Sequence, residues 1–218
     1  YVKSKNKIKL EILQNKSLEL SLFLSLPATL ALIFASEEIV SALFGYGSFN
    51  EESVKNSALA LFYFALGLPA FSMIKIFSSF IFARNDTKTP FYFSLISVIL
   101  NIVISVSLFS KIGFIIIPIA TTISSWLNGF LLMVFALNKN YFNFNNSFFI
   151  QLFKISISNL ICLGLFKILI NYFGNYFIFS NSYKFLAIIL LVILTFAFYL
   201  LISILIKAFK ISDIKLNY

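Results

Sequence analysis

Runs of apolar residues long enough to cross a lipid bilayer recur along this chain. A spanning helix needs ~20 such residues, and six stretches approach or exceed that length. They cover 18–36, 58–82, 91–109, 114–137, 148–172 and 185–206. A mean hydropathy of +0.96, with 60% hydrophobic and 11% charged residues, is typical of a membrane protein and not of a soluble domain. The sequence therefore predicts an all-α fold, a polytopic transmembrane helix bundle of about six spans.

The connectors between these runs are short and rich in Gly, Asn and Lys, as turns are. None is long enough to fold as an extramembrane domain. The predicted organisation is a basic cytoplasmic segment over 1–17, a four-helix part over 18–138, and two additional C-terminal transmembrane helices with a basic tail over 139–218.

The distribution of Lys and Arg predicts the orientation, because cytoplasmic loops carry an excess of these residues. One side has only Lys55, Lys111 and Lys184, close to four glutamates. We therefore expect the other side, and with it both chain ends, to face the cytoplasm. That side carries Lys3, Lys5, Lys7, Lys9, Lys16, Arg84, Lys88, Lys139, Lys154, Lys207, Lys210 and Lys215.

Composition also excludes several classes of function. The formal charge of +9 is spread over the ends of apolar runs and not gathered on one face, so we expect no nucleic acid partner and a role for membrane lipids instead. With no His and the single Cys162, the usual zinc and iron sites and a His-based triad are not available. The sequence predicts neither a metal nor a cofactor, and no enzyme.

The stretch "FARNDTKTP" is the most polar one in the middle of the chain. Thr89 precedes Pro90 and is thereby biased away from the α region, so we expect the second span to stop before the third begins. Asp86 or Thr87 can cap the following helix, with Pro90 in its first turn. A capped, positively charged cytoplasmic loop that includes Arg84 explains most of this pattern.

Lys75 lies several residues inside the second predicted span. A lysine at membrane depth is costly, so it normally faces a water-filled cavity or a partner, and an anionic ligand would be its natural counter-charge. The other explanation is snorkelling toward the cytoplasmic interface, which is ~13 Å away along a helix. We expect Lys75 to face a cavity and to bind substrate there.

Three prolines, Pro27, Pro69 and Pro118, fall within or near spans. A proline frees a backbone carbonyl and permits a helix kink. Kinked helices suit a protein that opens alternately to two sides, although a static kink filled by packing explains the same residues.

Two further features have plain structural interpretations. Asn101 and Asn128, with the small residues around "IATTISSWLNG", can join helices by hydrogen bonds. Glu37 and Glu38 precede an apolar stretch too short to cross a membrane, which predicts an interfacial half-helix with solvated carboxylates. The fifth and sixth runs offer broad apolar surface to lipid or to a lipid tail.

Several of these pieces together resemble one family. The residues "GLPAF", Lys75 and "FARNDTKTP", followed by "NIVISVSLF" and "GFIIIPIATTISSWLNGFLL", are similar in order and spacing to the later part of the lipid II flippase (MurJ/MviN) family of the multidrug/oligosaccharidyl-lipid/polysaccharide exporter superfamily. The resemblance is specific over 18–138. It implies two six-helix lobes around a cationic cavity, of which 18–138 would be the end of the second lobe. The last two helices would line a groove for a polyprenyl tail.

The resemblance implies transport of lipid II, or a similar polyprenyl diphosphate-linked glycan, across the bacterial inner membrane by alternating access. In that case Lys75 would bind the diphosphate, and Arg84, Asp86, Thr87, Thr89 and Pro90 would belong to a cytoplasmic gate. A missing N-terminal lobe would be a required partner. The alternatives are an exporter of another polyprenyl-linked glycan or a drug, and a non-transporting membrane scaffold fragment.

Overall fold

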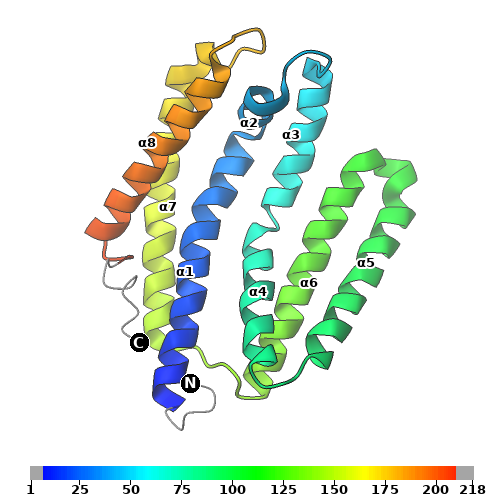
Figure 1. Ribbon diagram of the computed structural model, residues 1–218, viewed down its shortest axis with the longest axis vertical. Coiled ribbons are helices and arrows are strands. Elements are labelled where there is room, and N and C mark those ends of the chain that lie inside the picture. The colour runs from blue at the N-terminus through cyan, green and yellow to red at the C-terminus, as the bar shows by residue number, and fades with distance from the viewer. Residues whose placement is uncertain (1–6, 210–218) are drawn as a thin grey trace. The chain divides into compact units, whose positions relative to one another are not determined.

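The computed structural model describes residues 7–209, and over that range it contains helices and no strand. The predicted all-α fold is confirmed. The α-helices are α1 (Lys7–Phe34), α2 (Ser36–Phe44), α3 (Glu51–Ala65), α4 (Leu68–Phe82), α5 (Lys88–Ile112), α6 (Ile116–Asn138), α7 (Asn146–Phe173) and α8 (Lys184–Leu205). Two 3-10 turns, η1 (Gly113–Ile115) and η2 (Gly174–Tyr176), complete the order (Figure 1).

Four apolar helical stretches are long enough to cross a membrane: Ile8–Phe34, Lys88–Asn138, Asn146–Tyr176 and Lys184–Leu205. The bent pair α3 and α4 raises the count to five. Lys88–Asn138 is 51 residues long and includes both α5 and α6, which reverse direction near Gly113 and pack side by side (Figure 1). The predicted apolar runs are thus helical, while the number of spans and the side of each terminus stay predictions.

The chain divides into two compact units. Unit 1 comprises Tyr1–Ser25 and Tyr63–Phe149, and unit 2 comprises Leu26–Phe62 and Ile150–Tyr218. The divisions fall inside α1, α3 and α7. This grouping by contact does not test the predicted segment order, which stays a prediction. Residues 8–17 of the predicted basic segment are helical, whereas 1–6 and the predicted tail at 210–218 lie outside the described residues.

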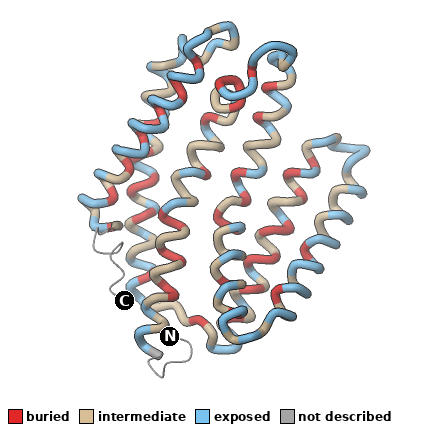
Figure 2. Tube along the Cα trace, in the orientation of Figure 1, coloured by how far each residue is buried: buried red, intermediate tan, exposed pale blue. Residues whose placement is uncertain are grey.

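In unit 1, α6 is the central helix and packs against both α4 and α5. Its buried positions are mostly small or polar, such as Ala120, Ser124 and Gly129, which lets neighbouring backbones approach closely. A Cβ on Gly129 would lie 3.5 Å from the Ala70 carbonyl oxygen of α4. In contrast, α5 buries only Pro90 and Ser97, and it is mostly exposed in Figure 2. Much of α5 is therefore left uncovered within unit 1.

In unit 2, aliphatic and aromatic side chains join the helices. Ala35, Phe166 and Leu191 form one buried cluster, and Val40, Val54 and Ala58 form another. The buried Cys162 directs its Sγ toward the Thr195 carbonyl oxygen, 3.5 Å away on α8. Cys162 is therefore a buried thiol in contact with α8.

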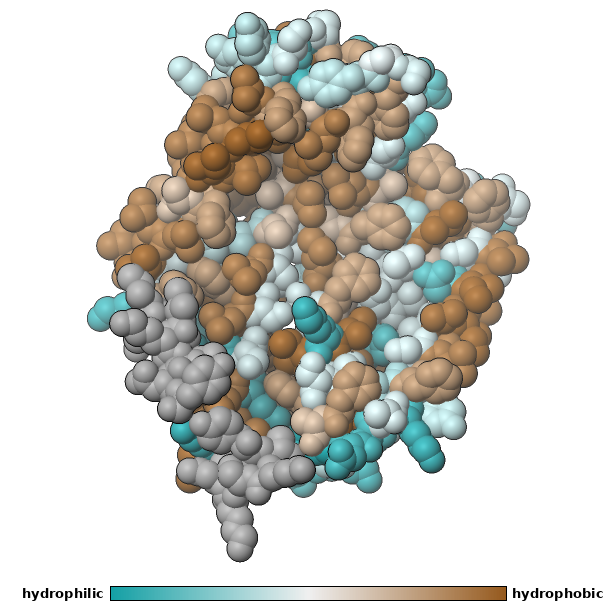
Figure 3. All heavy atoms as spheres, viewed as in Figure 1, coloured by the Kyte–Doolittle hydropathy of each residue, from teal (hydrophilic) through white to brown (hydrophobic). Residues whose placement is uncertain are grey.

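Large apolar side chains remain exposed on several helices. Val106 of α5 is 73% exposed and Leu205 of α8 is 75% exposed. Figure 3 shows hydrophobic side chains over much of the viewed face, with hydrophilic ones more frequent near the helix ends. Such a surface suits lipid and not water, which agrees with the prediction of a multi-pass membrane protein.

Candidate functional site

The turn between α4 and α5 is built as the local sequence predicts. Asn85 has a positive φ of 61°, a left-handed conformation that asparagine tolerates and that stops α4. The Asp86 carboxylate then accepts two hydrogen bonds from Thr89, 3.0 Å from the backbone N–H and 2.7 Å from the hydroxyl. Asp86 is therefore the residue that caps α5, and Thr87 makes no side-chain cap bond. Pro90 lies in the first turn, where its missing N–H costs nothing.

These bonds also set the electrostatics of the turn. The backbone N–H of Thr89, followed by its hydroxyl, holds the pKa of the Asp86 carboxyl below its usual range, and Lys139 adds a smaller attraction. Asp86 thus remains ionised wherever the turn is folded at neutral pH.

Arg84 joins this turn to the segment that follows α6. Its guanidinium donates to the carbonyl oxygen of Phe80 and to that of Tyr141, each at 2.6 Å. The same group lies 4.4 Å from the centroid of the Tyr141 ring. Hydrogen bonds from a charged donor are stronger than neutral ones. Arg84 consequently fixes a backbone position 57 residues away.

The segment from Lys139 to Asn145 receives further bonds from α1. Asn140, with a φ of 55°, ends α6, and the Tyr141 N–H donates back to the Ala136 carbonyl, as in a Schellman motif. Gln14 donates to the Tyr141 carbonyl oxygen at 2.9 Å, so Gln14 and Arg84 share this acceptor. Asn15 donates to the Asn143 carbonyl oxygen at 2.8 Å.

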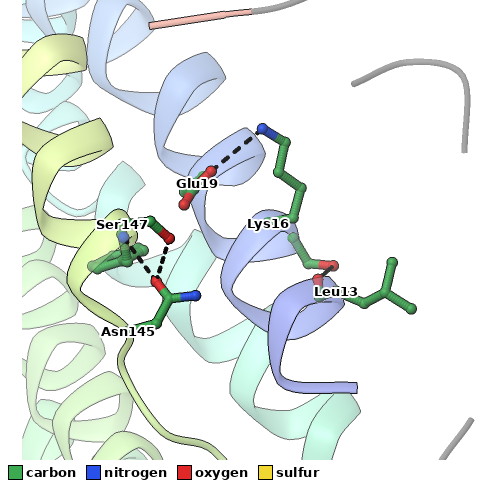
Figure 4. A network of polar contacts seen from close by, with 7 residues as sticks. Leu13, Lys16, Glu19, Asn145 and Ser147 are labelled. Atoms are coloured by element: carbon green, nitrogen blue, oxygen red, sulfur yellow. Dashed lines mark hydrogen bonds and ion pairs between the residues drawn. The ribbon is translucent and has the colours of Figure 1, made fainter. Parts of the chain in front are cut away.

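The same segment is also held by packing and by the start of α7. Phe142 is 1% exposed, and its ring lies 5.3 Å from that of Phe77 and 5.6 Å from that of Phe80. Asn145 accepts a hydrogen bond from the Ser147 hydroxyl, beside the part of α1 that carries the Lys16–Glu19 ion pair (Figure 4). Residues 139–145 are therefore an ordered connection between α6 and α7.

Lys75 lies on the face of α4 that does not pack within unit 1. The buried residues Ala70, Phe77 and Ile81 form the stripe that packs inward. Lys75 is exposed on a different stripe with Phe71, Ser79 and Phe82, as i, i+4 spacing requires. The helix thus presents one cation among apolar and hydroxyl side chains on a free face.

The predicted second span is a broken helix. The helices α3 and α4 bend by 41° across the break, and Gly67 stands where a Cβ would lie 3.2 Å from the Phe64 oxygen, the Phe71 ring and the Thr122 hydroxyl. Two side chains of α6 satisfy carbonyl groups at the end of α3. Thr122 donates to Tyr63 at 2.6 Å, and Trp126 Nε1 donates to Leu66 at 3.1 Å.

The three prolines have different positions in the helices. Pro27 lies inside α1, close to the boundary between the units at Ser25 and Leu26. Pro69 stands at the start of α4, just after the break. Pro118 is the third residue of α6, in the first turn, where helical N–H groups have no intrahelical acceptor. Pro118 therefore lies where a helix begins, and its role in a kink stays a prediction.

A cavity of about 350 Å³, lined by hydroxyl, amide and apolar side chains, lies among α4, α5 and α6. Asn101 donates to the Thr121 hydroxyl at 3.0 Å across it, and Asn128 donates to the Ser94 hydroxyl at 3.4 Å. The predicted hydrogen bonding between helices at Asn101 and Asn128 is confirmed. Over residues 7–209 no group of three His, Cys, Asp or Glu side chains is arranged to hold a metal ion.

Unit 2 contributes an apolar groove of about 240 Å³ between the end of α7 and the start of α8. Phe173, Leu186 and Leu190 are among its lining residues. Nearby, Lys184 is 1% exposed and its ammonium donates to the carbonyl oxygens of Gly45 and Phe179, at 2.6 and 2.8 Å. This lysine joins the α2–α3 turn to the α7–α8 turn.

Sequence reasoning missed the side chains that bond to distant backbone. The sequence presents Lys184 only as a charge on one side of the membrane and Trp126 carries no prediction. Thr122 belongs to the stretch expected to join helices by hydrogen bonds, but its acceptor is not predicted. The signal available for Trp126 and Thr122 was their i, i+4 spacing on one face of a helix. Their acceptors are carbonyl groups, which have no sequence signature.

Comparison with known proteins matches this chain to one family. The family model described as "Lipid II flippase MurJ" matches residues 1–188. A probable lipid II flippase of Rhizobium meliloti (strain 1021) is 44% identical over 120 residues, which are 55% of this chain and 22% of that protein. One from Rickettsia prowazekii (strain Madrid E) is 33% identical over 176 residues, 81% of this chain and 34% of that protein.

A solved structure agrees with the fold. The chain titled "Lipid II flippase MurJ, inward closed conformation" superposes with a TM-score of 0.73 at 24% identity, over 93% of this chain and 40% of that one. The present chain thus spans about a fifth to two fifths of the proteins it matches. The match over residues 1–188 shows that the chain belongs to the lipid II flippase MurJ family.

Proposed function

We propose that this chain is the C-terminal part of a flippase that moves lipid II across the bacterial inner membrane by alternating access. The family match over most of the chain carries this proposal. The relatives reported above are described as lipid II flippases, which does not favour an exporter of another glycan or a drug, or a scaffold. Transport would require a preceding lobe, because alternating access moves two parts against each other.

Two features supply groups that such a substrate needs. A diphosphate-linked lipid carries negative charge and a long hydrocarbon chain. Lys75, on the free face of α4, would bind the diphosphate as the one cation of its stripe. The groove between α7 and α8 would receive part of the hydrocarbon chain, because its walls are almost entirely apolar.

The turn containing Arg84, Asp86, Thr87, Thr89 and Pro90 would act as the cytoplasmic gate. Its capped helix start and its bonds to Tyr141 make it a rigid connection whose ends are held by single residues. A gate of this kind moves as a body when the Arg84 bonds exchange partners.

The decisive experiment replaces the matching C-terminal segment of the Rhizobium meliloti protein with this chain and asks whether the chimera supports growth when the host flippase is depleted. We expect growth with the unaltered segment and its loss with Lys75→Ala. Lys111→Ala is the matched control, because Lys111 is an exposed lysine at the end of α5. Equal growth of the two variants would remove Lys75 from the proposal, and failure of the unaltered chimera, if it is inserted in the membrane, would count against transport.

A further inference from the structure

A cavity of about 700 Å³ lies in unit 2, outside the proposed transport path. It lies among α2, α3, the end of α7 and the residues that follow η2. Half of its wall is apolar and includes Ile170 and Phe177. The polar residues of the wall are Glu37, Glu38, Ser41, Glu51, Lys55 and Asn171.

In the part of the chain that the structure describes, the wall leaves the Ser41 hydroxyl without a hydrogen-bond partner and its carboxylates without a partner ammonium. Within residues 7–209, Lys55 forms no ion pair with Glu38 or Glu51. Burial raises the pKa of the Glu38 carboxyl; a hydrogen bond from its own backbone N–H opposes this in part, and the charge of Glu37 raises the pKa a little further. A cation bound in the cavity would stabilise the ionised Glu38 carboxylate and reduce its repulsion with Glu37.

Ser41 gives an independent indication of a ligand. It is 5% exposed, and its hydroxyl has no hydrogen-bond partner. Several helical serines, such as Ser17, Ser97 and Ser158, donate to the carbonyl four residues earlier, and the Ser41 hydroxyl does not. A buried hydroxyl without a partner costs ~1–3 kcal/mol. A ligand that accepts or donates at this position would remove that cost.

Helix electrostatics explain only part of the acidic character. Glu37 and Glu38 occupy the first turn of α2, and Glu51 and Glu52 that of α3, where negative charge stabilises a helix. This accounts for carboxylates at both helix starts. It does not account for the partial burial of Glu38 or for the unpaired Ser41, and Glu52 does not line the cavity.

The chemistry of the wall selects the ligand. With three glutamates and one lysine, the wall of the cavity has a formal net charge of −2. Its apolar half suits the glycerol and upper chains of a lipid. Tyr172, Tyr176 and Tyr183, on either side of the turn after α7, are exposed, and tyrosines are enriched at the level of lipid headgroups.

We propose that this cavity binds the headgroup of an aminophospholipid. The carboxylates of Glu38 and Glu51 take the primary ammonium, Lys55 takes the phosphate, and the Ser41 hydroxyl gains its missing hydrogen bond. This inference does not depend on transport of lipid II.

The test measures equilibrium binding of phosphatidylethanolamine with one fluorescent chain to the purified chain in detergent. Phosphatidylcholine with the same chains has a cationic headgroup without N–H donors and should bind at least fivefold more weakly. Phosphatidylglycerol, without an ammonium, should do the same. Equal binding of the three lipids would overturn the proposal.

Variants test the residues. Glu38→Gln should weaken phosphatidylethanolamine binding at least fivefold, while Glu52→Gln, the control from the same turn as Glu51, should leave it unchanged. Ser41→Ala removes a hydroxyl that the unliganded protein does not use, so it should keep the melting temperature and weaken binding two- to threefold. Unchanged binding in a folded Glu38→Gln or Ser41→Ala protein would contradict the assignment. Because lipid binding is read directly, a failed growth assay leaves this result intact.

Discussion

Different kinds of contact stabilise the interior of each of the two compact units. In unit 1, several side chains each donate a hydrogen bond to a backbone carbonyl group of another element. They include Gln14, Arg84, Thr122 and Trp126. In unit 2, Lys184 concentrates two such bonds in one buried ammonium, and the helices otherwise meet mainly through apolar clusters. Distributed bonds tolerate the loss of a member better than a concentrated one does.

The sharpest test of this difference is Lys184→Met. The substitution keeps an unbranched apolar stem but leaves the buried carbonyl groups of Gly45 and Phe179 without their donor. We expect a loss of about 3 kcal/mol in unfolding free energy, measured by denaturant unfolding in detergent. Lys167→Met is the control, because the Lys167 ammonium lies 4.6 Å from the centroid of the Phe34 ring and contacts this aromatic face in place of two carbonyl groups. Equal losses of unfolding free energy in the two variants would show that Lys184 has no special role in unit 2.

In unit 1 the largest single effect should come from Arg84→Ala, at about 2 kcal/mol. The Tyr141 carbonyl keeps its bond from Gln14, so the connection after α6 should loosen and not unfold. Hydrogen exchange of residues 139–145 measures this directly. Arg84→Lys should recover little, because an ammonium cannot reproduce the planar fork that also covers the Tyr141 ring; full recovery would contradict this account.

A smaller loss, about 1 kcal/mol each, is expected for Thr122→Val and for Trp126→Phe. Each change keeps most of the shape and removes the donor to one carbonyl at the end of α3. The double variant should lose more than the sum, since both donors serve one break. Ser156→Ala, which removes a hydroxyl bonded within its own helix, is the control for polar deletion. Additive losses would mean that the two donors act separately.

The smallest expected effect is the dependence of stability on pH through Asp86. Because the folded state lowers the pKa of Asp86, its contribution is complete above the unfolded value of about 3.9 and is lost as the pH falls through the folded value. The difference in melting temperature between the natural chain and Asp86→Asn should therefore be constant from pH 7 to 5 and shrink below about pH 4. A difference that shrinks near neutral pH would contradict the assignment.

The parts of this fold that depend on neighbouring residues were predictable. Apolar runs of ~20 residues gave the helices, and the short spacing from Asp86 to Thr89 indicated the cap that the structure shows. Pro69 indicated a kink in the second span, but the end of α3 before it gave no sign of a break, since its residues remain apolar. Nor were the long-range bonds predictable, because a carbonyl such as that of Tyr141 exists at every residue and gives no pattern to read.

The carbonyl acceptors at the end of α3 constrain how the sequence of such a chain can evolve. The donors Thr122 and Trp126 lie 59 and 60 positions later in the sequence than Tyr63 and Leu66. Pro69 stands at the start of α4, where it removes no helical bond, so replacing it would not by itself straighten the helix. The bend is thus a shared property of three helices. Substitutions in α6 and at the break are expected to be inherited together, and α3 and α4 transplanted into another bundle would keep their angle only if α6 came with them.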